Sequence, residues 1–236
     1  EQHLSTHMLR EAREAPAAVA HQLAAGDDAY RAFGATLREQ NPASVLTVAR
    51  GSSDHAAHFM AYLIMARLGR LVTSLPMSLV TLYQSQIQCK GLASMAFSQS
   101  GQSPDLVAPM RYFTDGGAIT AAFVNDAESP VAKAVNWVFP LHAGHEQSVA
   151  ATKSFIAQLT AGAHVVAAWQ DDAALSAALK ELPATLERAC QTDWTRAVDA
   201  LVDAERLELG PGQGRLRAVR VEGAVVVDVP GVVDPG

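Results

Sequence analysis

The chain contains few cysteines and few charged residues, and each scarcity limits what the protein can be. Cys89 and Cys190 are the two cysteines among 236 residues and they form no motif, so we expect a reducing, cytoplasmic location. Charged residues make up 18% of the chain, and the formal net charge is −6. That balance argues against general nucleic-acid binding, because nothing would neutralise a phosphate backbone. A small phosphorylated ligand is still compatible with the negative net charge, because it needs only a few hydrogen-bond donors close to its phosphate.

Long hydrophobic runs and targeting signals are also missing. The most apolar stretch, residues 156–169, is shorter than a membrane span and contains Gln158, Thr160 and His164. The N-terminus is acidic and lacks the basic-then-apolar pattern of a signal peptide. Hydrophobic residues nevertheless make up 49% of the chain, enough for a substantial core. We expect a soluble protein, with no membrane partner, built from one large domain or one domain plus a fragment of another.

Short apolar runs alternate with helical patterns along most of the chain. Helical periodicity covers the first 40 residues in two stretches, and Pro42 ends it. Strands are expected at residues 44–49, 71–75, 92–97, 118–124 and 137–141. Helices are expected to follow at residues 52–66, 104–113, 130–135 and 147–169. This alternation predicts an α/β fold, a five-stranded parallel sheet with helices on both faces, preceded by N-terminal helices.

The last residues of the chain differ in composition from the rest. Residues 206–214 read as a strand and a glycine turn, and residues 219–233 are rich in Val, Gly and Pro without a helical pattern. The segment is too short for a second α/β module, and an edge hairpin, a disordered tail and an altered terminus all fit it. The sequence therefore divides into an N-terminal helical segment (1–41), an α/β domain (42–200) and an irregular tail (201–236).

Residues 97–104, Phe-Ser-Gln-Ser-Gly-Gln-Ser-Pro, lie between an expected strand and an expected helix. Backbone N–H groups of such a turn and the helix dipole attract an anion, and serine hydroxyls add donors. Two other polar turns, 51–53 and 142–153, also follow strands, so all three should lie at the sheet edge where α/β proteins bind ligands. The alternative is that residues 98–103 form an ordinary serine-rich turn without a ligand. The expected convergence of the three turns at one sheet edge favours a phosphate site.

These three turns together resemble the sugar isomerase (SIS) domain. The segments are Arg50-Gly51-Ser52-Ser53, the turn 98–103, and Glu-Gln-Ser-Val-Ala-Ala-Thr-Lys at 146–153. The similarity covers about residues 6–200 and is greatest to the first SIS repeat of the isomerase half of glucosamine-6-phosphate synthase and to isomerase-type glucosamine-6-phosphate deaminases. It implies a flavodoxin-like SIS domain that binds a phosphorylated sugar and forms a homodimer.

The resemblance also implies which residues bind the ligand. The residues carried over by position are Gly51, Ser52 and Ser53 at the first turn, Ser98, Gln99, Ser100 and Ser103 around the phosphate, and Val149, Ala151 and Lys153 near the sugar. Ala151 stands where the synthase pattern has serine, which removes a hydroxyl donor there. Gln102 replaces an acidic residue and makes the phosphate site less negative. Lys153 either neutralises phosphate or pairs with an acidic neighbour.

The catalytic residues are less evident than the binding residues. Glu146 is a candidate acid/base group, and a carboxylate that caps the long helix is the alternative. The resemblance implies that the proton-transfer glutamate, the ring-opening histidine and a C-terminal lysine come from a second SIS repeat or a partner subunit. The chain stops where that repeat would begin, and the resemblance offers the tail 201–236 as a remnant of that repeat, whose start would be residues 207–214. The pairs His55/His58 and His142/His145 have metal-like spacing but no completing ligand, so no metal is expected.

The leading hypothesis is an amino-sugar phosphate deaminase/isomerase that converts glucosamine 6-phosphate to fructose 6-phosphate and ammonia. Proton transfer between adjacent carbons needs acid/base groups and no cofactor. The chain starts at Glu1, with about 40 residues before the first strand, so glutamine-dependent amination is not expected. Another phosphosugar aldose–ketose isomerase and a non-catalytic sugar-phosphate-binding regulatory module are the alternatives.

Overall fold

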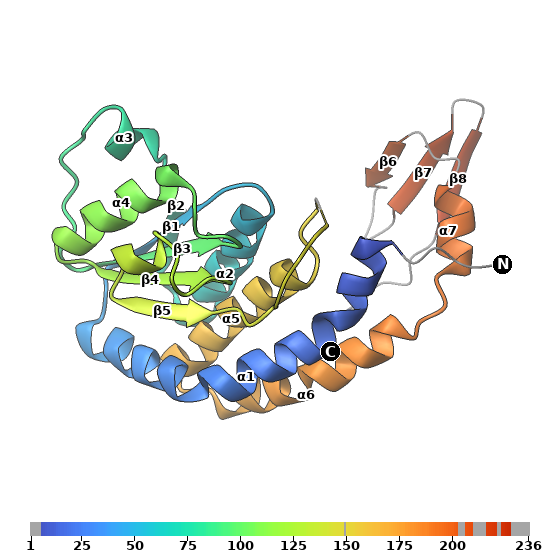
Figure 1. Cartoon of the computed structure of the whole chain (residues 1–236), viewed down its shortest axis with the longest axis horizontal. Helices are drawn as coiled ribbons and strands as arrows, with labels where there is room; N and C mark the ends of the chain where they lie inside the picture. The colour runs from blue at the N-terminus through green and yellow to red at the C-terminus, as the bar shows by residue number, and fades with distance from the viewer. Residues whose placement is uncertain (1–5, 149, 203–205, 210–215, 221–222, 228–236) are drawn as a thin grey trace. The chain divides into compact units, whose positions relative to one another are not determined.

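The computed structural model describes residues 6–148, 150–202, 206–209, 216–220 and 223–227 (Figure 1). They form two compact units, one within residues 1–190 and one within 191–236. The second unit contains helix α7 (Thr195–Leu201) and an antiparallel sheet in the order β6 (Arg206–Leu209), β7 (Leu216–Arg220) and β8 (Gly223–Val227). These three strands form a sheet of their own, and the division of the chain at residues 41 and 200 stays a prediction.

The first unit is built on a five-stranded sheet, as the sequence predicts. The strands are β1 (Ser44–Ala49), β2 (Leu71–Ser74), β3 (Leu92–Ser98), β4 (Ile119–Val124) and β5 (Trp137–Pro140). Their order is β2-β1-β3-β4-β5 and all neighbouring pairs are parallel. Ala49 pairs with Phe97, at the ends of the two central strands, so the turns that follow β1 and β3 start side by side.

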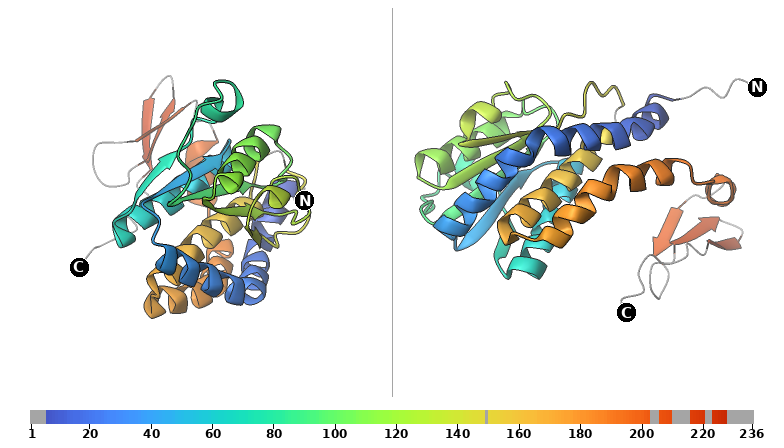
Figure 2. Two further views of the ribbon diagram at one scale, coloured as in Figure 1. Left: turned by 90° about the vertical axis from the view of Figure 1, so that its left-hand side faces the viewer. Right: turned by 90° about the horizontal axis from the view of Figure 1, so that it is seen from below.

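Helices cover both faces of this sheet (Figure 2). They are α1 (His7–Gln40), α2 (Ser52–Leu68), α3 (Ser78–Thr81), α4 (Pro104–Asp115), the 3-10 turn η1 (Ala132–Ala134), α5 (Lys153–Gln170) and α6 (Ala173–Cys190). Side chains of α1, α2 and α5 share a core with alternate residues of β1, β3 and β4. Side chains of α4 and η1 pack with the intervening residues on the opposite face. No helix in the described part of the chain is long and apolar enough to cross a membrane.

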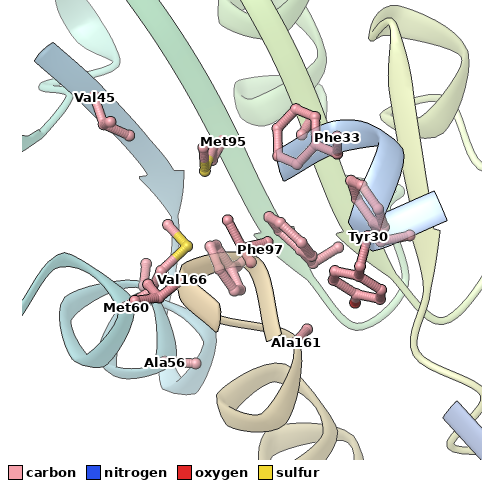
Figure 3. Close-up of a cluster of buried hydrophobic side chains, with 14 of the residues drawn as sticks. Tyr30, Phe33, Val45, Ala56, Met60, Met95, Phe97, Ala161 and Val166 are labelled. Carbon is pink, nitrogen blue, oxygen red and sulfur yellow. The ribbon is translucent and has the colours of Figure 1, made fainter. Parts of the chain in front are cut away.

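Aromatic side chains fill the core beneath α1 (Figure 3). Phe33 is fully buried and lies 5.1 Å from Phe139, while Phe97 stacks on Phe123 at 4.5 Å, all as ring-centroid distances. Burial of each such side chain contributes about 1.5–3 kcal/mol. The backbones of α1 and α5 also approach closely, because a Cβ added at Gly34 would lie 2.4 Å from the carbonyl oxygen of Ala168. These contacts fix α1 against α5.

The structure differs from the sequence expectation at several helices. The short helices α3 and α7 were not predicted, and the helix expected at residues 130–135 is only the 3-10 turn η1. The two helical stretches expected before residue 41 are one continuous helix, α1, because Tyr30 packs beside Gly26 and Arg31 pairs with Asp27 and Asp28. The helix expected from residue 147 begins only at Lys153, and residues 141–148 and 150–152 lie in a loop. Helix α6 was not predicted, and it packs with Leu179 against α1 and α5.

Candidate functional site

The three polar turns identified in the sequence follow β1, β3 and β5, and they leave the sheet from one edge because the strands are parallel. The turn after β1 is linked to the start of α4 by an ion pair between Arg50 and Asp105, 2.6 Å between guanidinium and carboxylate. Both side chains are more than half exposed, so the pair fixes orientation more than it adds stability.

The turn after β3 presents hydroxyl groups at the start of α4. Ser98 Oγ accepts the backbone N–H of Gly101 at 3.0 Å, and Ser100 Oγ accepts that of Gln102 at 3.4 Å. A hydroxyl that accepts one hydrogen bond still has its own proton to donate. Ser103 is the N-cap residue of α4, and its side chain makes no capping bond. Three serine hydroxyls and a helix N-terminus therefore remain able to donate to an anion.

Gly101 determines the shape of this turn. Its φ is +63°, in the left-handed region, and an added Cβ would lie 2.2 Å from Ser129 Oγ. Ser129 is 1% exposed and its Oγ accepts the N–H of Ala132, so it cannot easily move away. Only glycine fits at this position. Gln99 is half-buried, and its carbonyl accepts the N–H of Asn125, which ties the turn to the end of β4.

The turn after β1 begins helix α2. Gly51 is the N-cap residue, with φ +58° and ψ −134°, a conformation that favours glycine. Ser52 is exposed, and Ser53 is half-buried and accepts a hydrogen bond from the Gln158 side chain at 3.0 Å. That bond joins the turn to α5 and leaves the Ser53 proton free to donate.

The loop after β5 is held to the end of β4 by one asparagine. The Asn125 side chain accepts the N–H of Ala143 at 2.9 Å and donates to the carbonyl of Gly144 at 2.7 Å. Sequence reasoning did not identify Asn125. A polar residue directly after a buried strand was the available signal.

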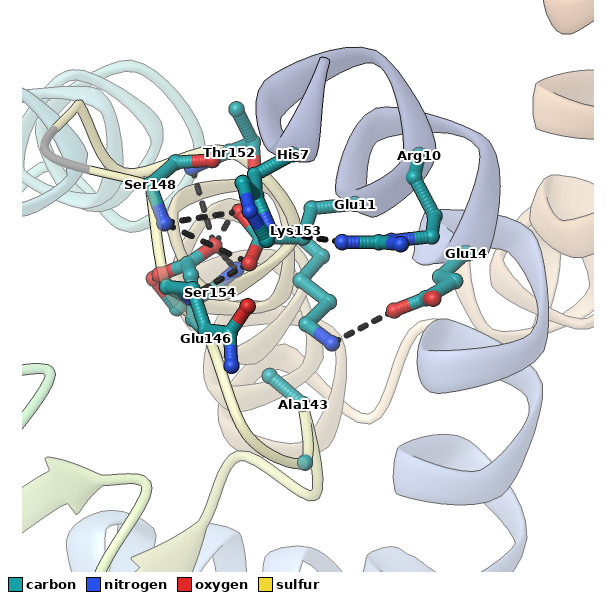
Figure 4. Close-up of polar contacts among 12 residues, drawn as sticks. His7, Arg10, Glu11, Glu14, Ala143, Glu146, Ser148, Thr152, Lys153 and Ser154 are labelled. Carbon is teal, nitrogen blue, oxygen red and sulfur yellow. Dashed lines mark hydrogen bonds and ion pairs between the residues drawn. The ribbon is translucent and has the colours of Figure 1, made fainter. Parts of the chain in front are cut away.

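Glu146 caps helix α5 (Figure 4). One carboxylate oxygen accepts the N–H and the hydroxyl of Thr152, both at 3.0 Å, and the N–H of Ser154 at 3.2 Å. The other oxygen accepts the hydroxyl of Ser154. Of the two interpretations of Glu146, the structure shows the cap, and an acid/base role stays a hypothesis.

Lys153 is the first residue of α5 and is buried, although the sequence placed it one turn into the helix. Its ammonium nitrogen lies 2.6 Å from a carboxylate oxygen of Glu14 on α1. It therefore pairs with an acidic neighbour, the second of the two roles expected for it. Ala151 is half-buried beside it, and Val149 lies outside the described residues.

Glu11 of α1 is a further residue that sequence reasoning missed. It is 3% exposed, and its carboxylate accepts the backbone N–H groups of Gln147 and Ser148. Burial alone would raise the pKa of Glu11, but the two amides and the charge of Lys153 outweigh it and lower the pKa to about 2. A glutamate on the apolar face of an amphipathic helix was the signal in the sequence.

The histidines do not gather into a metal site. No group of three or more His, Cys, Asp or Glu side chains that could hold a metal occurs in the described part of the chain. His58 contacts Asp54 one turn earlier in α2. His142 lies 4.6 Å from His21 between ring centroids, and burial, together with that neighbour, lowers the pKa of His142.

The fold and these turns define an α/β domain with hydroxyl and amide donors at the carboxyl edge of its sheet. The sequence pattern of the SIS domain matches residues 37–168, and the chain belongs to that family. It is 32% identical to the isomerizing glutamine–fructose-6-phosphate aminotransferase of Caulobacter vibrioides, over 75% of this chain and 31% of that protein. It is 28% identical to the enzyme of the same name from Treponema pallidum, over 93% of this chain and 39% of that protein. The chain thus spans about a third of these relatives.

Solved structures show the same fold. A Silicibacter pomeroyi protein, assigned provisionally as a phosphosugar isomerase, superposes with a TM-score of 0.81 at 41% identity, over 84% of this chain and 60% of that one. The C-terminal domain of the glucosamine-fructose-6-phosphate aminotransferase of Francisella tularensis superposes with a TM-score of 0.70 at 22% identity, over 87% and 62%.

Proposed function

We propose that this chain binds a phosphorylated sugar and acts in aldose–ketose isomerisation of that sugar. The observation that carries the proposal is the turn 98–103, where the hydroxyls of Ser98, Ser100 and Ser103 meet the N-terminus of α4. Hydroxyl and amide donors at a helix N-terminus match the three oxygens of a phosphate monoester. The similarity to isomerizing aminotransferases and to the Silicibacter pomeroyi protein supports a phosphosugar as the ligand.

The sugar would lie between the phosphate turn and the two other turns. In this arrangement Gln99 lines the phosphate, Gly51, Ser52 and Ser53 lie near the sugar hydroxyls, and the segment 150–153 lies along the ring. Lys153 would act through its pair with Glu14, since its ammonium group is already neutralised there. Ala151 offers no hydroxyl, so the backbone of this segment would make the contacts.

The specific reaction we propose is conversion of glucosamine 6-phosphate and water to fructose 6-phosphate and ammonia. A base moves a proton between C2 and C1 after ring opening, and water then releases the amine from C2. Glu146 is engaged with the start of α5, so we propose that the proton-transfer groups come from outside the described residues, by way of a homodimer. The same observation favours a second candidate, a sugar-phosphate-binding module without catalysis.

Titration calorimetry with glucosamine 6-phosphate and with inorganic phosphate tests the binding site. Ser100→Ala removes a donor to a charged group, which is worth about 1.5–3 kcal/mol, and should weaken binding of both ligands roughly 10- to 150-fold. Ser44→Ala is the matched control, because Ser44 begins β1 at the opposite edge of the sheet. Undiminished affinity in Ser100→Ala, or no binding of either ligand by the unaltered chain, would refute the phosphate site.

A turnover assay separates the candidate reactions. Release of ammonia together with ketose from glucosamine 6-phosphate supports the deaminase. Ketose without ammonia, from the matching aldose phosphate, indicates an isomerase. Tight binding without either product indicates the binding module.

A further inference from the structure

The first turns of α1 reach the loop that follows β5 and bond to its backbone (Figure 4). Glu11 accepts the N–H of Ser148 at 3.2 Å and 3.3 Å, one distance for each carboxylate oxygen, and also accepts the N–H of Gln147. These residues are 136 and 137 positions apart in the chain. The contact therefore depends on tertiary packing and not on local sequence.

A buried carboxylate is retained in a fold only where its lone pairs are satisfied, because desolvation of the charge is costly. Glu11 is 3% exposed, and backbone amides of the loop satisfy it. Within the described part of the chain, the Glu11 carboxylate is in turn the only hydrogen-bond partner of the backbone N–H groups of Gln147 and Ser148. The glutamate and the loop thus fix each other.

The neighbouring pair strengthens this attachment. Glu14 lies one turn further along α1, and its carboxylate contacts the ammonium of Lys153 at 2.6 Å. Lys153 follows the loop directly, so α1 holds the loop at residues 147 and 148 and again at its end. Asn125 and Glu146 hold the same loop from the sheet and from α5.

We propose that Glu11 is a positioning residue for the sugar: it holds the backbone of Gln147 and Ser148 so that residues 150 and 151 keep the geometry that the sugar contacts require. This inference rests on the proposed function. Glu11 does not touch the phosphate turn, so its effect is confined to the sugar part of the ligand. Sugar phosphate and inorganic phosphate consequently respond differently to its loss.

The test compares the two ligands in two variants. Glu11→Gln keeps the side-chain volume but removes the charge and replaces one acceptor oxygen with an NH2 donor. It should weaken glucosamine 6-phosphate binding about tenfold or more while phosphate affinity changes less than twofold. Glu11→Asp keeps the charge on a shorter arm and should restore part of the affinity. Glu39→Gln is the control, since Glu39 is exposed and lies about 40 Å further along the same helix.

A second measurement uses the unaltered chain, so it tests the proposal even if the variants do not fold. Amide hydrogen exchange at Gln147 and Ser148 should slow when glucosamine 6-phosphate is added and stay constant when inorganic phosphate is added. Equal slowing by both ligands overturns the proposal.

The variant data have equally distinct outcomes. Equal losses of affinity for both ligands in Glu11→Gln would show a purely structural role, and unchanged affinity for both would show no role. Either result overturns the positioning role of Glu11 and leaves the proposed function standing. Failure of the unaltered chain to bind either ligand refutes the proposed function itself.

Discussion

Replacement of Gly101 by alanine should destabilise the phosphate turn by two separable effects. The φ of +63° puts an L-residue in the left-handed region, which costs about 1–2 kcal/mol. The new Cβ would also lie 2.2 Å from Oγ and 2.6 Å from Cβ of Ser129. Overpacking of this kind costs about 1–3 kcal/mol. Together, Gly101→Ala should lower the free energy of unfolding by about 2–5 kcal/mol.

Gly91 supplies the matched control for the backbone effect. Its φ is +79°, and nothing lies within 4 Å of an added Cβ, so Gly91→Ala should cost only about 1–2 kcal/mol. The difference between the two variants measures the clash. Combining Gly101→Ala with Ser129→Gly should recover most of that difference, because the two clashing atoms are gone.

Urea unfolding followed by tryptophan fluorescence, to which the buried Trp169 contributes, measures these changes. Phosphate affinity should fall in Gly101→Ala, which displaces the serine hydroxyls, and stay constant in Gly91→Ala. The reasoning is refuted if Gly101→Ala costs no more than Gly91→Ala, or if Ser129→Gly brings no recovery.

Three further outcomes follow from the described contacts. Glu146→Gln weakens the cap of α5 and should cost about 1–2 kcal/mol in urea unfolding; no cost would contradict the cap. Gly34→Ala places a Cβ 2.4 Å from the carbonyl oxygen of Ala168, so it should cost about 1–3 kcal/mol or more, and an unchanged melting temperature would contradict the close approach. Burial lowers the pKa of both His142 and His164 below 6.5, so the unfolded chain takes up protons first as the pH falls, and stability should decrease below about pH 6.5. His164→Gln should flatten that decrease in melts recorded across the pH range.

The strands could be predicted from the sequence because buried parallel strands are short apolar runs bounded by polar turns. Residues 44–49 and 92–97 show this pattern, and β1 and β3 lie there within one residue. The position of the turn 98–103 between β3 and α4 could be predicted for the same reason, whereas its phosphate role stays a proposal. Its serines, Gly101 and Pro104 determine the local backbone geometry, so their spacing in the sequence is enough to predict a turn followed by a helix.

The start of α5 could not be predicted in that way. Residues 147–152 have a helix-compatible composition, but Glu146 caps the helix from a position well before its first turn. Glu11 then holds the preceding amides from another helix. Local propensity carries no information on such a contact, because tertiary packing decides it. The continuity of α1 is a similar case, since Tyr30 packs against Phe139 of β5 and stacks on His164 of α5, and local propensity carries no information on these contacts.

The two halves of the candidate site therefore differ in what determines them. In the proposed site, one turn and the glycine that shapes it would set the phosphate half. The sugar half would depend on a loop that contacts of α1, the end of β4 and the start of α5 hold. Substitutions that loosen α1 should accordingly change the preference among sugars before they change phosphate affinity. Relatives that share the turn and differ in α1 would then bind the same phosphate group on different sugars, so the specificity of this fold should be sought in residues far from the phosphate in sequence.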